Sequence, residues 1–186
     1  MKRTFDLALG ILLLFVFAIP FFGLVVLVKM TSRGPVFYWS DRVGCHNKLF
    51  KMPKFRSMQV GTPVVATHLL KDPGVYMTPV GSFLRRSSLD EIPQLWSILM
   101  GDMSFVGPRP ALFNQHDLID LRTKEGVHVL VPGLTGWAQV NGRDDLPIPR
   151  KVAFDAEYKN KIGFWFDLRI ILLTAVRVIR KDNVTH

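Results

Sequence analysis

The sequence contains a single cysteine, Cys45, among its 186 residues. An intrachain disulfide needs two cysteines and a cysteine-based zinc cluster needs more, so the sequence excludes both. Its five histidines do not have the spacing of metal ligands. The sequence also lacks the glycine-rich phosphate loops of nucleotide-binding proteins, the H-E-x-x-H zinc motif and the G-x-S-x-G nucleophile turn. These absences argue against a P-loop or Rossmann nucleotide-binding protein, a zinc metalloprotease of the H-E-x-x-H type and an α/β-hydrolase.

Acidic residues are scarce relative to basic ones, with 15 Asp and Glu against 24 Lys and Arg, for a net charge of +9. This excess favours a polyanionic partner, which could be a nucleic acid, an acidic membrane surface or a phosphorylated substrate. Aromatic residues do not interleave the basic ones as an RNA-binding sheet requires, so we expect no nucleic-acid partner. The length and the 48% hydrophobic fraction predict one folded domain, with or without a small appendage.

The first 33 residues predict a membrane anchor. Residues 7–28 contain no charged side chain, and about twenty apolar residues suffice for a helix to cross a bilayer. The run is long for a cleaved signal peptide and no small-x-small cleavage site follows Pro20, so the sequence favours an anchor over that alternative. Pro20, near its middle, would bend a helix, and basic residues flank both ends, so charge does not select an orientation. A spanning helix and a re-entrant helix both remain open, and either would anchor a globular domain over residues 34–186.

The globular part predicts an α+β fold with a short β-hairpin and several helices. Residues 36–40 and 48–52 read as strands around a turn, and residues 60–80 as a loop. Helices are expected over 152–161 and 163–180. The second of these is amphipathic, and it either packs in the core or lies flat at a lipid interface with its cations toward the headgroups.

Residues 89–99 carry apolar side chains at helical spacing, and the Ser88-Leu-Asp-Glu91 segment has the pattern of a capping box. Asp90 and Glu91 would then lie in the first turn. Successive helical residues point about 100° apart, so these two acids cannot face each other, but they can hold different roles. One could attack or bind, while the other orients a metal or a proton. Ordinary helix capping is the alternative.

Arginines surround this pair in the sequence. Arg85 and Arg86, one turn upstream, could bind phosphate. A carboxylate beside such a site would repel a phosphorylated substrate unless a divalent cation such as Mg²⁺ bound both. Arg109, between Pro108 and Pro110, has little backbone freedom, which suits anion recognition. An ordinary turn is the alternative for this segment.

The loop over residues 132–143 carries glycines that would let the backbone approach a ligand closely. Its polar side chains could donate hydrogen bonds to that ligand. These residues are Gly133, Gly136, Gly142, Gln139, Asn141 and Arg143. A turn-rich loop without a ligand explains the same composition.

Four segments together resemble the bacterial sugar transferase family, the small monotopic phosphoglycosyl transferases. They occur in the order KFRSM (54–58), LRRSSLDEIPQL (84–95), GDMSFVGPRP (101–110) and PGLTGWAQVNGR (132–143). The similarity extends over nearly the whole chain, from the anchor to the last helix. In one departure, Ile19 stands where family members often have a serine before the proline. This departure bears on the bend of the anchor and leaves the chemistry untouched.

The resemblance implies that the protein moves sugar-1-phosphate from a UDP-sugar to polyprenyl phosphate and releases UMP. This would be the first membrane step of exopolysaccharide, O-antigen, capsule or glycoprotein assembly. Asp90 would be the nucleophile that forms an aspartyl-phosphosugar intermediate, and Glu91 its partner, with both near an Mg²⁺ cofactor. The implied substrate-binding residues are Arg85, Arg109, Arg143, Lys54, Arg56, Gln139 and Asn141.

The family also favours a re-entrant anchor bent at Pro20, on the cytoplasmic face of the bacterial inner membrane. Membrane lipids, a homodimer partner and downstream glycosyltransferases are the other partners that the resemblance implies. The rival hypothesis is a non-catalytic basic membrane module, which the charge and the anchor alone would permit. That module would show no metal dependence.

Overall fold

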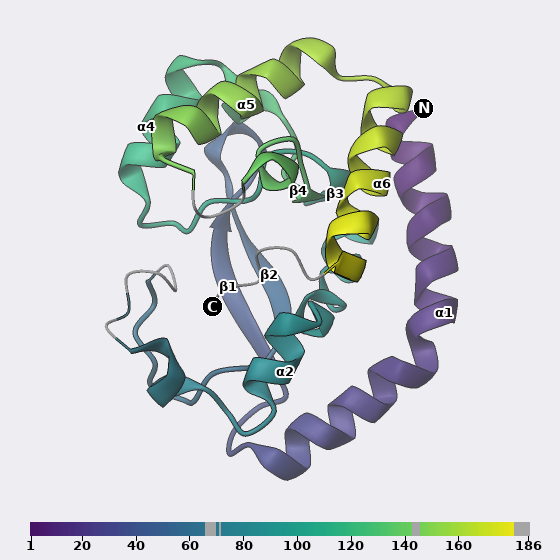
Figure 1. Ribbon diagram of the computed structural model, residues 1–186, viewed down its shortest axis with the longest axis vertical. Coiled ribbons are helices and arrows are strands. Elements are labelled where there is room, and N and C mark those ends of the chain that lie inside the picture. The colour runs from purple at the N-terminus through teal and green to yellow at the C-terminus, as the bar shows by residue number, and fades with distance from the viewer. Residues whose placement is uncertain (66–69, 71, 143–145, 181–186) are drawn as a thin grey trace.

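The structure is a computed structural model that describes residues 1–65, 70, 72–142 and 146–180. It mixes helices with small sheets, which confirms the α+β expectation (Figure 1). The regular elements are α1 (Lys2–Thr31), β1 (Phe37–Val43), β2 (Leu49–Phe55), α2 (Gly81–Arg86), α3 (Gln94–Met100), β3 (Ser104–Val106), α4 (His116–Lys124), β4 (Gly133–Thr135), α5 (Ile148–Lys161) and α6 (Phe164–Arg180).

In the part of the chain that the structure describes, the strands form two separate two-stranded sheets. Strands β1 and β2 pair antiparallel from Phe37 opposite Phe55 to Val43 opposite Leu49, so the predicted hairpin is confirmed and is longer than expected. The short strands β3 and β4 pair in parallel. The segment that contains β4 was predicted as a loop, and no element was predicted for β3. Each of them has three residues, which is too few for a periodic pattern to show.

The helix predicted over residues 89–99 begins later than expected. A 3₁₀ turn covers Leu89–Glu91, and α3 starts only at Gln94. Ser88 has a φ of 55°, in the left-handed region, and its side chain caps neither element in the described structure. The capping-box prediction is therefore wrong, because an N-cap residue needs extended backbone. Gly101, with a φ of 94° in the left-handed region, ends α3.

The predicted ends of the last two helices agree with the structure, but one start does not. Helix α5 begins at Ile148, four residues before the predicted start at position 152. Pro149 accounts for the difference, since proline is favoured in the first helical turn. Helix α6 confirms the helix predicted over 163–180. Ile170 of α6 is fully buried whereas Trp165 is 78% exposed, so the helix packs in the core along one side only.

Two glycines of the 132–143 loop, Gly133 and Gly136, let segments of the chain pack closely. A Cβ on Gly133 would lie 2.1 Å from the backbone nitrogen of Gly107, and one on Gly136 would lie 2.1 Å from the Gly107 oxygen. The absent side chains therefore let β4 and the following turn close onto the segment after β3. This contact places the segment that leads to Arg109.

Replacing Gly136 with alanine should destabilise the fold by about 1–3 kcal/mol, because backbone must move to admit the methyl group. Thermal unfolding of the detergent-solubilised protein measures the change. The matched control is Gly163→Ala, since a Cβ there would lie 3.8 Å from the Lys161 carbonyl oxygen, an ordinary van der Waals contact. Equal melting temperatures for the two variants would contradict the close approach.

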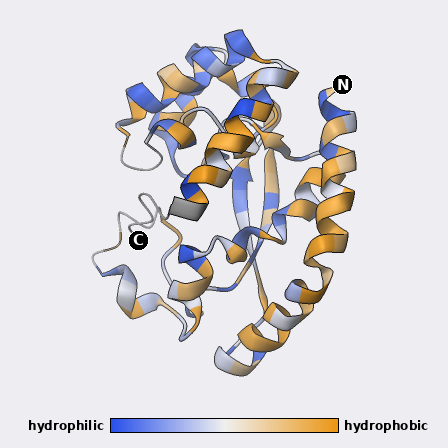
Figure 2. Ribbon diagram, turned by 45° about the vertical axis from the view of Figure 1, so that its right-hand side comes forward, coloured by the Kyte–Doolittle hydropathy of each residue, from blue (hydrophilic) through white to orange (hydrophobic). Residues whose placement is uncertain are grey.

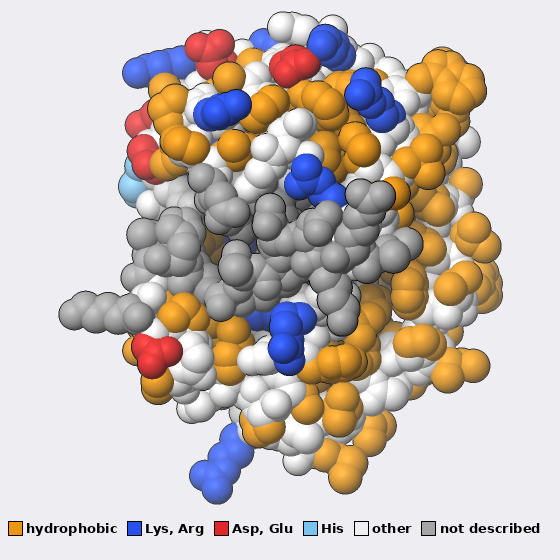
Figure 3. Space-filling view, in the orientation of Figure 1, with side chains coloured by type: hydrophobic (Ala, Val, Ile, Leu, Met, Phe, Trp, Pro, Cys, Tyr) orange, Lys and Arg blue, Asp and Glu red, His pale blue; other side chains and the backbone are white. Residues whose placement is uncertain are grey.

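Helix α1 is apolar on nearly all sides through most of its length (Figure 2). By length and composition it could cross a membrane, and only 11% of its most apolar stretch is buried in the protein. Its outer face exposes large side chains such as Phe15, Ile19 and Phe22. In Figure 3 hydrophobic side chains gather along the edge where α1 lies in Figure 1. A helix in the core of a soluble protein would not leave this face uncovered.

The start of α1 is tied to the globular part by charged groups. The Lys2 ammonium donates to the Asp167 carboxylate of α6, the Tyr158 hydroxyl and the Val106 carbonyl oxygen. The Asp6 carboxylate, which is 4% exposed, accepts hydrogen bonds from residues of β3. The first two turns of α1 are therefore bound to α6, α5 and β3.

The second half of α1 packs on the same globular part. Leu24 and Val28 form a buried cluster with Phe55 of β2 and Leu84 of α2. The Phe21 ring lies 5.2 Å from the Phe55 ring, measured between centroids. Pro20 lies inside the helix, which changes direction partway along its length (Figure 1). Both halves of the apolar helix are thus held by one body.

Candidate active site

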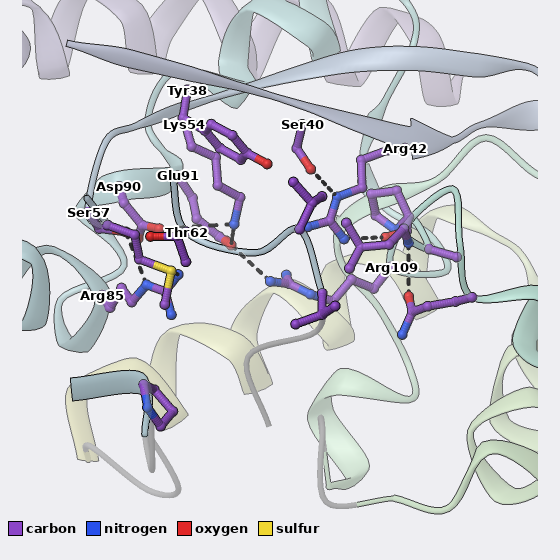
Figure 4. Close-up of a pocket in the computed structure, with 18 of the residues that line it drawn as sticks. Tyr38, Ser40, Arg42, Lys54, Ser57, Thr62, Arg85, Asp90, Glu91 and Arg109 are labelled. Atoms are coloured by element: carbon purple, nitrogen blue, oxygen red, sulfur yellow. Dashed lines mark hydrogen bonds and ion pairs between the residues drawn. The ribbon is translucent and has the colours of Figure 1, made fainter. Parts of the chain in front are cut away.

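A cavity of about 400 Å³ lies between the β1–β2 hairpin and the segments that follow α2 and β3. Five arginines and two lysines line it, against two acidic residues, Asp90 and Glu91, among the described residues. The side chains from these separate segments converge in Figure 4. A cavity with this excess of cations favours a ligand with several negative charges.

The hairpin supplies one wall of the cavity through the alternation of its side chains. Tyr38, Ser40 and Arg42 occupy every second position of β1 and line the cavity together. Lys54 of β2 is the register partner of Tyr38 and lies on the same face. The pairing of the two strands therefore brings Lys54 to the acidic pair, which is far away in the sequence.

Glu91 is held by two cations. The Lys54 ammonium lies 2.8 Å from its Oε1 atom, and Nη2 of Arg109 lies 3.0 Å from the same oxygen. Burial alone would raise the pKa of Glu91, but the charges and hydrogen bonds of Lys54 and Arg109 outweigh it and hold the pKa well below its usual range. Glu91 is therefore ionised and fixed in place.

Asp90 has a different environment from its neighbour. Its side chain is 8% exposed, and its one ion pair within the described structure is with Lys54, at 4.0 Å. Burial raises the pKa of Asp90, and this effect outweighs the lowering by Lys54, Arg85 and Arg109. The adjacent acids therefore differ in their surroundings, because two cations bind Glu91 while Asp90 is the more basic carboxylate.

Arg85 and Arg56 both line the cavity, as the sequence predicted for binding residues. Nε of Arg85 donates to the Ser57 hydroxyl at 3.0 Å, which points the guanidinium along the side of the cavity that holds Asp90 (Figure 4). Nε of Arg56 donates to the Pro35 carbonyl oxygen at 2.8 Å. Arg86, in contrast, bonds its own helix and does not line the cavity.

The three polar residues of the 132–143 loop that were predicted to bind substrate differ in their position relative to the cavity. Gln139 lines the cavity, and its Nε2 donates to the Leu134 carbonyl oxygen at 3.0 Å. Nδ2 of Asn141 donates to the Trp137 carbonyl oxygen within its own turn, and Asn141 does not line the described cavity. Arg143 lies outside the described residues.

Sequence reasoning missed Arg42 and Arg122, which also line the cavity. Arg42 could have been found from its alternation with Tyr38 once the hairpin was extended to position 43. Arg122 lies on α4 and carried no signal in the sequence, because only the tertiary packing brings α4 beside residue 109.

The acidic pair has the donor chemistry for a magnesium ion that arrives with a diphosphate. Mg²⁺ is usually bound by one or two carboxylates together with substrate phosphates, and it needs no all-protein cage. No group of three or more potential metal ligands is found among the described residues. The Lys54 ammonium already lies between them, which shows that the position attracts positive charge.

Comparisons with known proteins point to one family. A family model described as bacterial sugar transferase matches residues 1–181. The chain is 44% identical, over 84% of its length, to a UDP-glucose:undecaprenyl-phosphate glucose-1-phosphate transferase of Xanthomonas campestris pv. campestris, and spans 34% of that protein. It is 40% identical, over 95% of its length, to a protein of the same description from Escherichia coli, and spans 40% of it. An uncharacterized sugar transferase of Bacillus subtilis is 37% identical over 99% of the chain and 90% of that protein.

Proposed function

Because the chain belongs to the bacterial sugar transferase family, we propose that it transfers sugar-1-phosphate from a UDP-sugar to polyprenyl phosphate and releases UMP. The single observation that carries this proposal is the pair of adjacent acids in a cation-lined cavity, of which Glu91 accepts hydrogen bonds from Lys54 and Arg109. The similar proteins from Xanthomonas campestris and Escherichia coli are named UDP-glucose:undecaprenyl-phosphate glucose-1-phosphate transferases, which supports the same reaction.

The proposed chemistry proceeds by two displacements at one phosphorus atom. The Asp90 carboxylate attacks the phosphorus that bears the sugar, the bond to the UMP oxygen breaks, and UMP leaves with that electron pair. An oxygen of polyprenyl phosphate then attacks the same phosphorus and releases the Asp90 carboxylate. The product is a polyprenyl-diphosphate sugar, which would pass to downstream glycosyltransferases. Covalent catalysis lets the site handle one substrate at a time.

The remaining charges position the substrate for this attack. Glu91 fixes Lys54 and Arg109 beside Asp90, where both cations can contact the diphosphate. Arg85 supplies a guanidinium on the other side of Asp90, suited to bidentate phosphate contacts (Figure 4). Asp90 and Glu91 would hold the Mg²⁺ ion, which would neutralise diphosphate charge so that an anionic carboxylate can approach.

Purified protein in detergent should release UMP from a UDP-sugar in the presence of polyprenyl phosphate and Mg²⁺. Chelation with EDTA should abolish the release, and added Mg²⁺ should restore it, since the metal offsets the charge of the diphosphate. A panel that includes UDP-glucose and UDP-galactose, assayed with and without EDTA, measures both effects.

No UMP from any member of that panel would contradict the proposed reaction and favour the non-catalytic membrane module. Release that is unaffected by EDTA would contradict the proposed magnesium site alone. A basic module would instead bind polyanions weakly and lose them as the salt concentration rises.

We also propose that α1 enters and leaves the membrane on one face, the cytoplasmic face of the bacterial inner membrane. Both of its halves pack on the same globular part, and a straight spanning helix would draw that part through the bilayer. Proline leaves a backbone carbonyl group of the helix without its usual hydrogen bond, and such a group needs a partner when it lies inside the bilayer.

Cysteine labelling in intact cells tests this topology, in a Cys45→Ser background with Thr4→Cys or Met30→Cys. Both positions are exposed in the structure and flank the apolar run. Neither should react with a membrane-impermeant reagent from outside, and both should react after permeabilisation. Labelling of one position from outside would mean that the helix spans the membrane.

A further inference from the structure

The segment that carries Arg109 is held at three successive carbonyl groups. The backbone nitrogen of Gly133 donates to the Pro108 oxygen at 2.9 Å. Nη1 of Arg122 donates to the Arg109 oxygen at 2.8 Å, and Nη1 of Arg42 donates to the Pro110 oxygen at 3.0 Å. Strand β4, helix α4 and strand β1 each contribute one of these donors, so the backbone around Arg109 is fixed from three directions.

Arg122 is in turn fixed by a carboxylate behind it. Its Nε and Nη2 atoms donate to Oδ2 of Asp155 on α5, at 2.9 and 2.6 Å. The two side chains are 10% and 1% exposed. Asp155 does not line the cavity, whereas Arg122 and Arg109 do. The guanidinium therefore spans the distance between a buried carboxylate and the backbone of the site.

Stability alone is a weak explanation for this buried pair. Taking two charges out of water costs free energy that their attraction often only balances, and apolar residues of similar volume frequently replace such pairs without loss. Apolar residues could not donate a hydrogen bond to the backbone of the site. The third nitrogen of Arg122, Nη1, does so, because it lies beyond the ion pair and donates to the Arg109 carbonyl oxygen.

We propose that Asp155 and Arg122 are positioning residues that hold the Arg109 guanidinium against Glu91. The hydrogen-bonded path runs from Asp155 through Arg122 to the Arg109 backbone, and from the Arg109 side chain to Oε1 of Glu91 at 3.0 Å. The flanking prolines stiffen this short segment, so an anchor on its backbone limits where the side chain can lie. The inference rests on the proposed function, because it assigns Arg109 a place in that reaction.

The test removes the path without leaving a buried charge. The double variant Arg122→Met/Asp155→Leu replaces both members of the pair with apolar residues, so it should fold with a melting temperature near that of the wild type. We expect its kcat for UMP release to fall about ten-fold, since the Arg109 backbone loses a hydrogen-bond donor and the guanidinium loses its fixed position. A wild-type kcat in this folded variant would overturn the proposal, and the pair would then have a structural role only.

A double-mutant cycle with Arg109→Gln separates positioning from other effects. If the pair acts through Arg109, then in the Arg109→Gln background the same double substitution should lower kcat less than about two-fold. A ten-fold loss in both backgrounds, or a raised KM with unchanged kcat, would instead assign Arg122 a direct contact with the substrate and contradict the positioning role. Should the double variant not fold, Arg122→Lys, which keeps both charges, replaces it in the same cycle.

Hydrogen exchange measured by mass spectrometry provides a readout that does not depend on catalysis. The double variant should exchange faster than wild type in a peptide spanning residues 105–115, while peptides from α5 keep their exchange rates. Equal exchange at 105–115 would overturn the proposal. Hydrogen exchange also distinguishes failure of the proposed function from failure of the positioning role. An inactive wild-type protein would contradict the proposed function, while the exchange rates would still show whether Asp155 and Arg122 hold the Arg109 segment.

Discussion

Replacing Asp90 with asparagine should abolish UMP release, by at least about a thousand-fold, and leave the protein folded and bound to membranes. An amide cannot attack phosphorus as a carboxylate does. The fold should tolerate the change, because burial raises the pKa of Asp90 and the ionised form is therefore the costly one above that pKa. Neutral asparagine removes this cost, so the melting temperature should stay equal or rise.

Two measurements check the effect of Asp90→Asn, namely UMP release and thermal unfolding of the same preparation. The matched control is Asp41→Asn, since Asp41 lies on β1, is about half exposed and pairs with Lys51 away from the cavity. The control should keep the wild-type rate. Near-normal turnover by Asp90→Asn would remove Asp90 from the role of nucleophile, and equal losses in both variants would show a general effect of lost charge.

Replacing Glu91 with glutamine should lower kcat by about a hundred- to a thousand-fold, the second-largest effect that we expect. Glu91 is the common partner of Lys54 and Arg109, and its loss frees both cations from their fixed positions. The Lys54 ammonium is already 4.0 Å from Asp90 and would pair with it, which lowers the pKa and the nucleophilicity of that carboxylate.

The control for Glu91→Gln is Glu125→Gln, because the Glu125 side chain is exposed at the end of α4. It should have the wild-type rate in the same UMP assay. The two variants should also differ in the step that they impair. Glu91→Gln should still form the covalent intermediate slowly, whereas Asp90→Asn should form none. A loss below ten-fold for Glu91→Gln would contradict its role in holding the two cations.

The composition of the site was predictable where its residues are close in sequence. Arg85, Asp90 and Glu91 lie within one segment, and Arg109 lies between prolines that mark a rigid loop. The capping box was misread because the pattern of Ser88 and Glu91 does not reveal that the chain reverses at Ser88 after α2. Only the left-handed backbone of Ser88 shows that Asp90 lies on a 3₁₀ turn facing the cavity.

Residues brought in by tertiary packing were not predictable in the same way. Arg122 and Asp155 lie on separate helices, and their spacing in the sequence does not indicate that they meet. Gly133 and Gly136 correctly indicated a close backbone approach, but they could not show that the neighbour is Gly107 rather than a ligand. The apolar character of the anchor was likewise evident in the sequence. Only the structure shows that both halves of α1 pack on the same globular part.

Mass spectrometry of enzyme quenched during turnover tests the central claim most directly. With a UDP-sugar and Mg²⁺ present and polyprenyl phosphate withheld, the peptide that contains Asp90 should gain the mass of one phosphosugar, and added polyprenyl phosphate should remove it. An adduct on a different side chain, or turnover in which the sugar never becomes attached to the protein, would contradict the mechanism.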